Sequence, residues 1–131
     1  MIGLDTNVLL RYFVRDDEAA YRAASDLLGD LTTDNPGFIT QVTMAELYWV
    51  LSRSYRFDRS SCLAVVQSLV RTESLEFDDG EGVVRALHLA EAGADFADAL
   101  IQGTMEQFGA HETVTFDRSA ARRLGWRLLA S

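Results

Sequence analysis

The alternation of short apolar segments with longer segments of helical periodicity is the feature that most constrains the fold of this chain. Strands are predicted at 1–4, 38–40, 75–77 and 113–116, where apolar, β-branched or aromatic residues cluster. Helices are predicted at 7–14, 16–31, 43–55, 59–72, 82–92, 96–108 and 118–124. Strands that alternate with helices form a parallel sheet with helices on both faces. We therefore predict an α/β fold with three layers, α/β/α, and a short-stranded parallel sheet.

The composition is that of one globular domain spanning residues 1–131. Apolar residues make up 48% of the sequence, which is enough for an ordinary core, and there are no repeats or linker-like segments. The one cysteine, Cys62, cannot form an intramolecular disulfide, so we expect a cytoplasmic protein with a buried thiol. Since no apolar run approaches the ~20 residues of a membrane span, we expect no membrane association and no targeting segment.

The charge of the chain bears on its partners. The net charge is −8, whereas proteins that bind nucleic acid usually carry a basic surface. Bound divalent cations would invert the local field if some of the acids were metal ligands, and an acidic surface also suits a basic protein partner. All twelve basic residues are arginines, so a mechanism that needs a catalytic lysine is excluded.

Four acidic residues are predicted to meet at one edge of the sheet. Asp5 and Asp117 each end a predicted strand, and Glu46 lies about one turn into the helix that follows the strand at 38–40. Asp98 lies near the start of a helix that leads into a strand, and such a helix begins at the same edge. Ligands of parallel sheets bind beyond the carboxyl ends of the strands. Asp5, Glu46, Asp98 and Asp117 are therefore the candidate catalytic residues.

Clustered carboxylates repel one another unless a cation joins them. Mg²⁺ prefers octahedral oxygen coordination and is held in proteins by a few carboxylates together with water. Such an ion lowers the pKa of a bound water, polarises a phosphoryl oxygen and stabilises the leaving oxygen.

Each acid also has a structural interpretation. Asp5 and Asp117 can cap the helices that follow them, and Asp98 can be a solvated helix residue. Glu46 can complete a capping box with Thr43.

Four segments of the chain resemble the acidic motifs of PIN domains, especially of the VapC-type toxins of bacterial toxin–antitoxin pairs. The segments are Ile2-Gly3-Leu4-Asp5-Thr6-Asn7-Val8-Leu9-Leu10, Thr43-Met44-Ala45-Glu46-Leu47, Ala94-Asp95-Phe96-Ala97-Asp98-Ala99-Leu100-Ile101 and Thr113-Val114-Thr115-Phe116-Asp117. The resemblance extends over almost the whole chain, in order and in spacing. It implies a PIN-like fold, endoribonuclease activity that depends on Mg²⁺ or Mn²⁺, a homodimer, and neutralisation by a small antitoxin, for which the charge favours a basic tail.

The resemblance also implies roles for individual residues. Asp5 and Asp98 would bind the metal directly, while Glu46 and Asp117 would complete the acidic pocket. Asn7 would orient Asp5 through a side-chain hydrogen bond, and Thr115 would support Asp117.

The third motif leaves one ambiguity. Asp95 and Asp98 are three residues apart and share a helix face, so either can be the ligand. We favour Asp98, which precedes Ala-Leu-Ile as in the family, and assign Asp95 to the helix cap.

Several other residues have two interpretations. The basic stretch Arg118, Arg122, Arg123 and Arg127 can bind RNA phosphates or form a solvated helix face. The same alternatives hold for Arg11 and Arg15, with the solvated face favoured. His88 and His111 lie far from the motifs and are assigned to structural or exposed positions.

Two other classes of α/β protein begin with a strand-terminal aspartate. Phosphotransfer enzymes of the haloacid-dehalogenase kind need a second aspartate where this chain has Asn7, as well as a lysine. Response-regulator receivers also need a lysine. A non-catalytic binding module and a stand-alone RNA-processing nuclease both remain alternatives to a toxin.

Overall fold

The computed structural model describes residues 1–129, and its Cα positions fall into two compact units, Met1–Gly80 and Glu81–Ser131. We call them unit 1 and unit 2 and describe each by itself. The single domain of residues 1–131 therefore stays a prediction.

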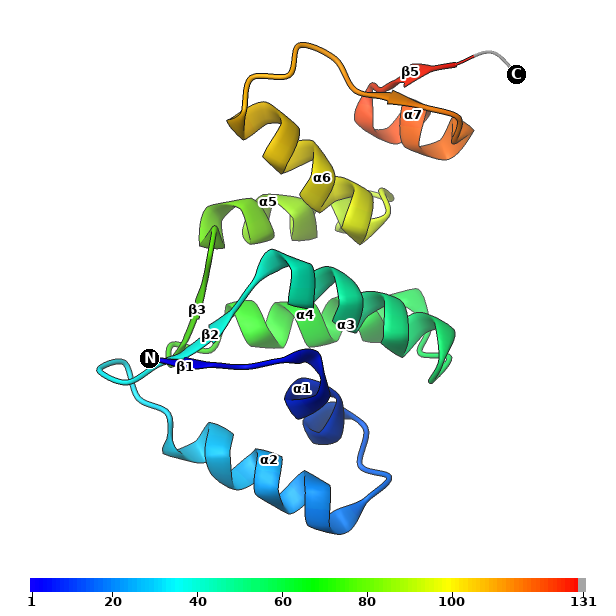
Figure 1. Cartoon of the computed structure of the whole chain (residues 1–131). Helices are drawn as coiled ribbons and strands as arrows, with labels where there is room; N and C mark the ends of the chain where they lie inside the picture. Colours follow the sequence, from blue (N-terminus) through cyan, green and yellow to red (C-terminus); the bar gives the residue numbers. More distant parts are fainter. Residues whose placement is uncertain (130–131) are drawn as a thin grey trace. The chain divides into compact units, whose positions relative to one another are not determined.

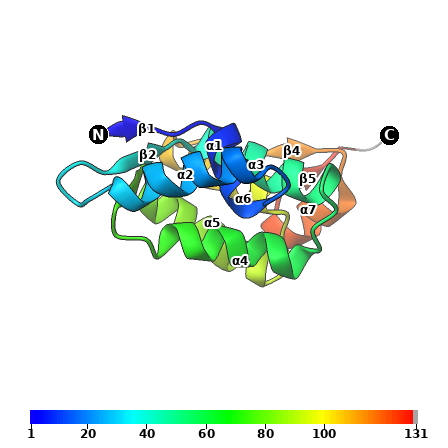
Figure 2. The ribbon, with the colours of Figure 1, turned by 90° about the horizontal axis from the view of Figure 1, so that it is seen from below.

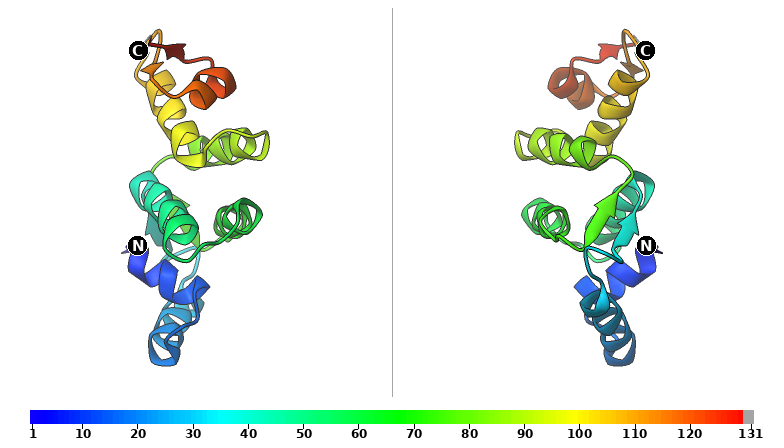
Figure 3. Two further views of the ribbon diagram at one scale, coloured as in Figure 1. Left: turned by 90° about the vertical axis from the view of Figure 1, so that its right-hand side faces the viewer. Right: turned by 90° about the vertical axis from the view of Figure 1, so that its left-hand side faces the viewer.

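Unit 1 contains a parallel sheet of three short strands in the order β1-β2-β3: β1 (Ile2–Gly3), β2 (Gly37–Ile39) and β3 (Leu75–Phe77). Figure 3 shows β2 beside β3. The central strand needs a glycine, because a Cβ on Gly37 would lie 2.8–2.9 Å from side-chain carbons of Leu4, Leu31 and Leu75. The two neighbouring strands and the segment before β2 therefore approach Gly37 closely.

Four helices complete unit 1: α1 (Thr6–Phe13), α2 (Glu18–Asp30), α3 (Gln41–Arg53) and α4 (Arg59–Val70). Helix α1 packs against α2 and α3, and α3 packs against α4 (Figure 1). Each helix begins where a side-chain oxygen accepts a hydrogen bond from an amide of the first turn; these N-caps are Asp5, Asp17, Thr40 and Asp58. Apolar residues of α1, β2 and α3 form the centre of the core, with Leu9, Ile39, Met44 and Leu51 fully buried.

Unit 2 contains three helices and two strands. The helices are α5 (Gly80–Glu91), α6 (Phe96–Gln107) and α7 (Arg118–Leu124). The strands β4 (Val114–Thr115) and β5 (Arg127–Leu128) form a separate parallel pair, joined through α7 (Figure 2). Gly125 ends α7 in the left-handed conformation, with φ 72°, and turns the chain into β5.

The predicted strands and helices are all observed within a few residues of their predicted ends. Two features of the sheets were not predicted. The strand β5 is too short and too exposed to show a strand pattern. It also pairs with β4 in a separate two-stranded sheet. The prediction that Asp5 and Asp117 end strands of one sheet is therefore wrong, because β1 and β4 belong to different sheets.

Among residues 1–129, no helix has the length and the apolar composition needed to cross a membrane.

Candidate active site

Asp5 directly follows β1 and caps α1. Its Oδ1 accepts hydrogen bonds from the main-chain amides of Asn7 (2.9 Å) and Val8 (3.3 Å). The bond from Asn7 thus comes from its main chain, where a side-chain bond was predicted. Because both bonds end on Oδ1, the Oδ2 atom of this exposed residue takes part in neither of them. The capping role is therefore compatible with metal binding through Oδ2.

Glu46 lies in the second turn of α3, and its Oε1 accepts a hydrogen bond from the Thr6 hydroxyl. The capping-box interpretation of Glu46 is wrong, because the N-cap of α3 is Thr40, whose Oγ1 accepts from the Thr43 amide (3.1 Å). Thr6 is buried, with 8% of its surface exposed, and was not among the predicted site residues. In the sequence, its position directly after Asp5 is the feature that could have indicated a role for Thr6 in the site.

Asp5 and Glu46 line one cavity of about 470 Å³ in unit 1. The other residues of its lining are mostly polar: Thr6, Asn7, Leu10, Thr43, Val50, Ser54 and Tyr55. The structure thus brings together the two predicted site residues of this unit, although they are forty-one positions apart in the sequence.

In unit 2, Asp95 caps α6, as assigned from the sequence: its Oδ2 accepts from the Asp98 amide (3.0 Å). Asp98 is partly buried. Burial raises the pKa of the Asp98 carboxyl above its ordinary value, and the negative charges of Asp95 and Asp117 raise it further. The Asp98 carboxylate is therefore in an environment where a nearby cation would stabilise its charged form.

Asp117 has the same arrangement as Asp5, at the end of β4. Its Oδ1 accepts from the amides of Ser119 (2.8 Å) and Ala120 (3.1 Å), so it caps α7 and Oδ2 is not used in these bonds. Thr115 contacts Asp117 as predicted, in that its Oγ1 accepts from the Asp117 amide (3.0 Å). One oxygen of Asp117 is therefore held by the protein backbone.

The donors of both units have the chemistry that Mg²⁺ and Mn²⁺ require, since they are all carboxylate oxygens. Within residues 1–129, no three His, Cys, Asp or Glu side chains lie close enough to hold a metal ion. Unit 1 supplies Asp5 and Glu46, and unit 2 supplies Asp98 and Asp117, so a site made of all four stays a prediction.

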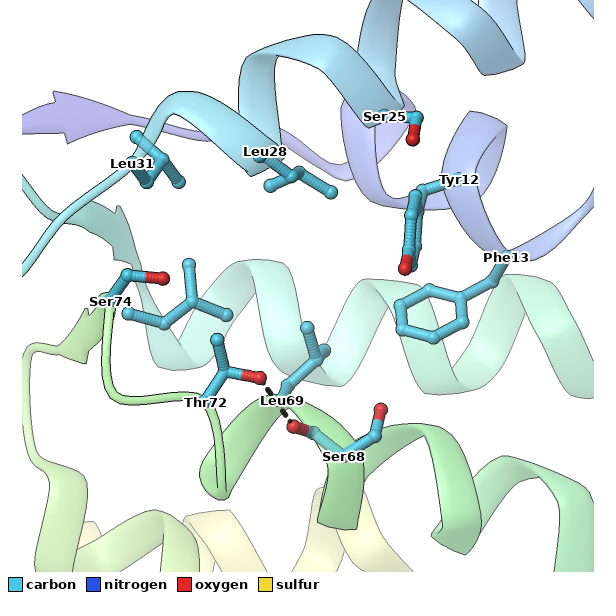
Figure 4. A pocket seen from close by; sticks show the side chains of 11 residues that line it. Tyr12, Phe13, Ser25, Leu28, Leu31, Ser68, Leu69, Thr72 and Ser74 are labelled. Atoms are coloured by element: carbon cyan, nitrogen blue, oxygen red, sulfur yellow. Dashed lines mark hydrogen bonds between the residues drawn. The ribbon is translucent and has the colours of Figure 1, made fainter.

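A second cavity in unit 1, also of about 470 Å³, contains no acid (Figure 4). Apolar side chains from α1, α2, α4 and β3 line most of it, among them Tyr12, Phe13, Leu28 and Leu69. Its hydroxyl groups include that of Thr72, which donates to the Ser68 carbonyl at 2.7 Å. Its lining has no ligand for a divalent cation beyond hydroxyl and carbonyl oxygens.

The remaining charged candidates fit their structural interpretations. Arg11 pairs with Asp16 (3.4 Å) and Arg15 with Glu18 (2.6 Å), all of them exposed. His88 and His111 are exposed.

A family model described as PIN domain matches residues 2–125, and no curated protein matches the chain. Seven helices and a small parallel sheet among the described residues agree with this family. The predicted three-layer α/β/α PIN-like fold is thereby confirmed.

Proposed function

Because this chain belongs to the PIN domain family, whose members are generally metal-dependent nucleases, we propose that it is an endoribonuclease. It hydrolyses phosphodiester bonds of RNA and requires Mg²⁺ or Mn²⁺. The observation that carries this proposal is the cavity that Asp5 and Glu46 share, since carboxylate oxygens are the protein ligands that Mg²⁺ prefers.

In this proposal Asp5 and Asp98 bind the metal, and Glu46 and Asp117 complete the acidic pocket. When bound, the ion would lower the pKa of a water and polarise a phosphoryl oxygen. The capping bonds of Asp5 and Asp117 support their parts, because each carboxylate is oriented through its Oδ1 while Oδ2 takes no part in these bonds. The raised pKa of Asp98 supports its part, because a cation offsets the repulsion from its neighbours.

Thr6 is a positioning residue in this proposal. Its hydroxyl donates to Oε1 of Glu46, which restricts the orientations of a carboxylate that lines the cavity. A general base or an outer ligand needs such a fixed direction to act on a water molecule.

The experiment is cleavage of an end-labelled, single-stranded or looped RNA by the purified chain. We expect cutting with Mn²⁺ or Mg²⁺, none with excess EDTA, and a loss of at least tenfold in rate for Asp5→Asn. The matched control is Asp34→Asn, which neutralises an exposed loop acid of the same unit and should cut like the parent. Equal cutting in EDTA, after further purification to remove contaminating nucleases, would refute the metal mechanism.

We also propose that the chain is the toxin of a toxin–antitoxin pair, acts as a homodimer in the cytoplasm, and is neutralised by a small protein with a basic tail. The support is the resemblance of its four motifs to VapC-type toxins and the net charge of −8, which attracts a basic segment. An arginine of that tail would reach the carboxylates and compete with the metal.

Expression in a bacterial host tests this role. A toxin should arrest growth, a short reading frame for a protein with a basic tail should lie directly upstream of its gene, and co-expression of that protein should restore growth. Normal growth with active, soluble protein would instead identify a stand-alone processing nuclease. Inactive protein under all metal conditions would favour a binding module.

A further inference from the structure

The four arginines that follow Asp117 differ in what they contact. We propose that Arg118 and Arg122 bind the phosphates of the RNA substrate, whereas Arg123 and Arg127 stabilise unit 2 and do not bind RNA. This inference rests on the proposed ribonuclease function and names the surface that holds its substrate.

Arg127, in β5, is engaged by Glu112. Its Nε and Nη2 donate to the two carboxylate oxygens of Glu112 at 3.1 and 3.0 Å, in the bidentate geometry typical of arginine–carboxylate pairs. A phosphate would have to displace Glu112, and the charge of Arg127 is already compensated by that residue.

Arg123, in α7, is engaged by the turn between α5 and α6. Its Nη1 donates to the Ala92 carbonyl at 3.4 Å, and its guanidinium lies over Gly93. A Cβ built on Gly93 would lie only 2.7 Å from Nη1 and 2.8 Å from Cζ of Arg123. This guanidinium is thus packed against backbone and connects α7 to the segment that precedes Asp95.

Arg118 and Arg122 have no such partner. Both are exposed, and neither has an acidic group within ion-pair distance among residues 1–129. They are four residues apart on α7 and therefore lie on one face of the helix. Arg118 also directly follows Asp117, so this face begins at a predicted site residue.

The negative net charge of the molecule makes RNA binding depend on arginines that have no carboxylate partner. A chain with net charge −8 repels RNA over most of its surface, and an arginine paired with a carboxylate offsets little of that repulsion. The fifth arginine of unit 2, Arg85, lies 4.0 Å from Glu81 and is also paired. Arg123 has no carboxylate partner, but its guanidinium is packed against Gly93 and bonded to the Ala92 carbonyl. In unit 2, Arg118 and Arg122 are therefore the two arginines that have neither an ion pair nor a hydrogen bond to the backbone among residues 1–129.

The test measures binding of a fluorescein-labelled oligouridylate by fluorescence anisotropy over a series of NaCl concentrations. The protein carries Asp98→Asn to prevent cleavage. For single-stranded RNA, the logarithm of the binding constant falls with the logarithm of salt by about 0.7 per phosphate contact. Arg118→Gln/Arg122→Gln should lower this slope by about 1.4, and each of the two single substitutions by about 0.7. Arg127→Gln removes one positive charge from the same region, as each single substitution does, and should leave the slope unchanged.

Two further comparisons show whether a changed slope comes from misfolding, and whether a failure of this inference also refutes the proposed function. Arg118→Lys/Arg122→Lys keeps both charges and should keep the parent slope, and all variants should melt within a few degrees of the parent. The inference would be overturned if the slope were unchanged in the double glutamine variant, or if Arg127→Gln lowered the slope by about 0.7, while the parent still cut RNA. A parent that neither binds nor cuts RNA would overturn the proposed function together with this inference.

Discussion

At the scale of single residues, the acids of this chain combine structural and chemical roles. Asp5 and Asp117 each cap a helix with Oδ1 and keep Oδ2 out of these bonds. Asp95 caps α6 and thereby holds the amide of Asp98, whose own carboxyl is partly buried between two negative charges. A carboxylate at a helix N-terminus is stabilised by the free amides there, so acids can be kept at these positions at little cost in stability.

Asp98→Asn and Asp95→Asn should have different effects on RNA cleavage. The first replaces a proposed ligand by a neutral amide of similar shape, so we expect cutting to fall at least a hundredfold. The second should keep most of the activity, since asparagine caps a helix about as well as aspartate. A gel-based cleavage assay measures both rates. An inactive Asp95→Asn variant together with an active Asp98→Asn variant would show that Asp95, and not Asp98, is the metal ligand.

The raised pKa of Asp98 predicts a pH-dependent effect on stability in the absence of metal. A carboxyl whose pKa is higher in the folded than in the unfolded state contributes its stability below the unfolded pKa and loses it as the pH rises through the folded pKa. Asp98→Asn should therefore melt slightly above the parent at neutral pH, and this advantage should vanish in acid, where both forms are neutral. A variant that melts well below the parent at neutral pH without metal would contradict this.

Thr6→Val should impair activity through Glu46. The substitution keeps the shape of the side chain but removes the hydroxyl that donates to Glu46, and we expect cutting to fall about tenfold, or about 1.4 kcal/mol of barrier. Thr6→Ser, which restores the donor, should recover most of the rate. If both variants cut equally well, Thr6 does not position Glu46.

At the scale of elements, the turn between α5 and α6 links the third acidic motif to α7. Gly93 adopts φ 121°, a conformation that L residues rarely adopt, and the Arg123 guanidinium fills the space beside it. This contact joins the segment before Asp95 to the helix that begins after Asp117. This glycine–arginine contact is therefore one of the links between the two acidic motifs of unit 2, beside the hydrogen bond from Trp126 to Gln102.

Gly93→Ala should lower the free energy of unfolding by about 1–3 kcal/mol, because the backbone conformation is unfavourable for alanine and the new methyl group displaces Arg123. The control is Gly103→Ala in the middle of α6, where a Cβ meets nothing within 4 Å. That change should raise the free energy of unfolding by about 0.5–1 kcal/mol, since alanine favours a helix. Urea unfolding followed by circular dichroism measures both, and an unaffected Gly93→Ala would show that the contact with Arg123 yields at little cost.

At the scale of the whole molecule, the proposal that Asp5 and Asp98 bind metal predicts an effect of metal on stability. The family match over residues 2–125 spans both units, and each supplies two of the four candidate acids. A ligand that binds only the native state raises its stability in proportion to its affinity.

Mn²⁺ should accordingly raise the melting temperature of the parent, and Asp5→Asn and Asp98→Asn should each lose most of this increase. The double variant should lose little more than either single one, because residues that share an ion are not additive. Differential scanning fluorimetry with and without Mn²⁺ measures this, with Asp34→Asn as the control. If the two single losses were independent and summed in the double variant, each unit would bind its own ion.

The sequence by itself determined the helices, the first four strands and the caps formed by Asp5, Asp95 and Asp117, because these depend on residues within a few positions of one another. The N-cap Asp95 three residues before Asp98 is one such short-range signal, and the periodicity of 59–72 is another. Only the tertiary structure decided the partner of Glu46, the pairing of β5 with β4, and the division of the four arginines into engaged and free. These depend on contacts through space, such as that between Thr6 and Glu46, which lie forty residues apart. A local pattern specifies the secondary structure of a segment, whereas tertiary packing decides which side chains form hydrogen bonds and ion pairs with one another. For this reason one arginine-rich stretch contains two residues that bind other parts of the protein and two that are open to a substrate.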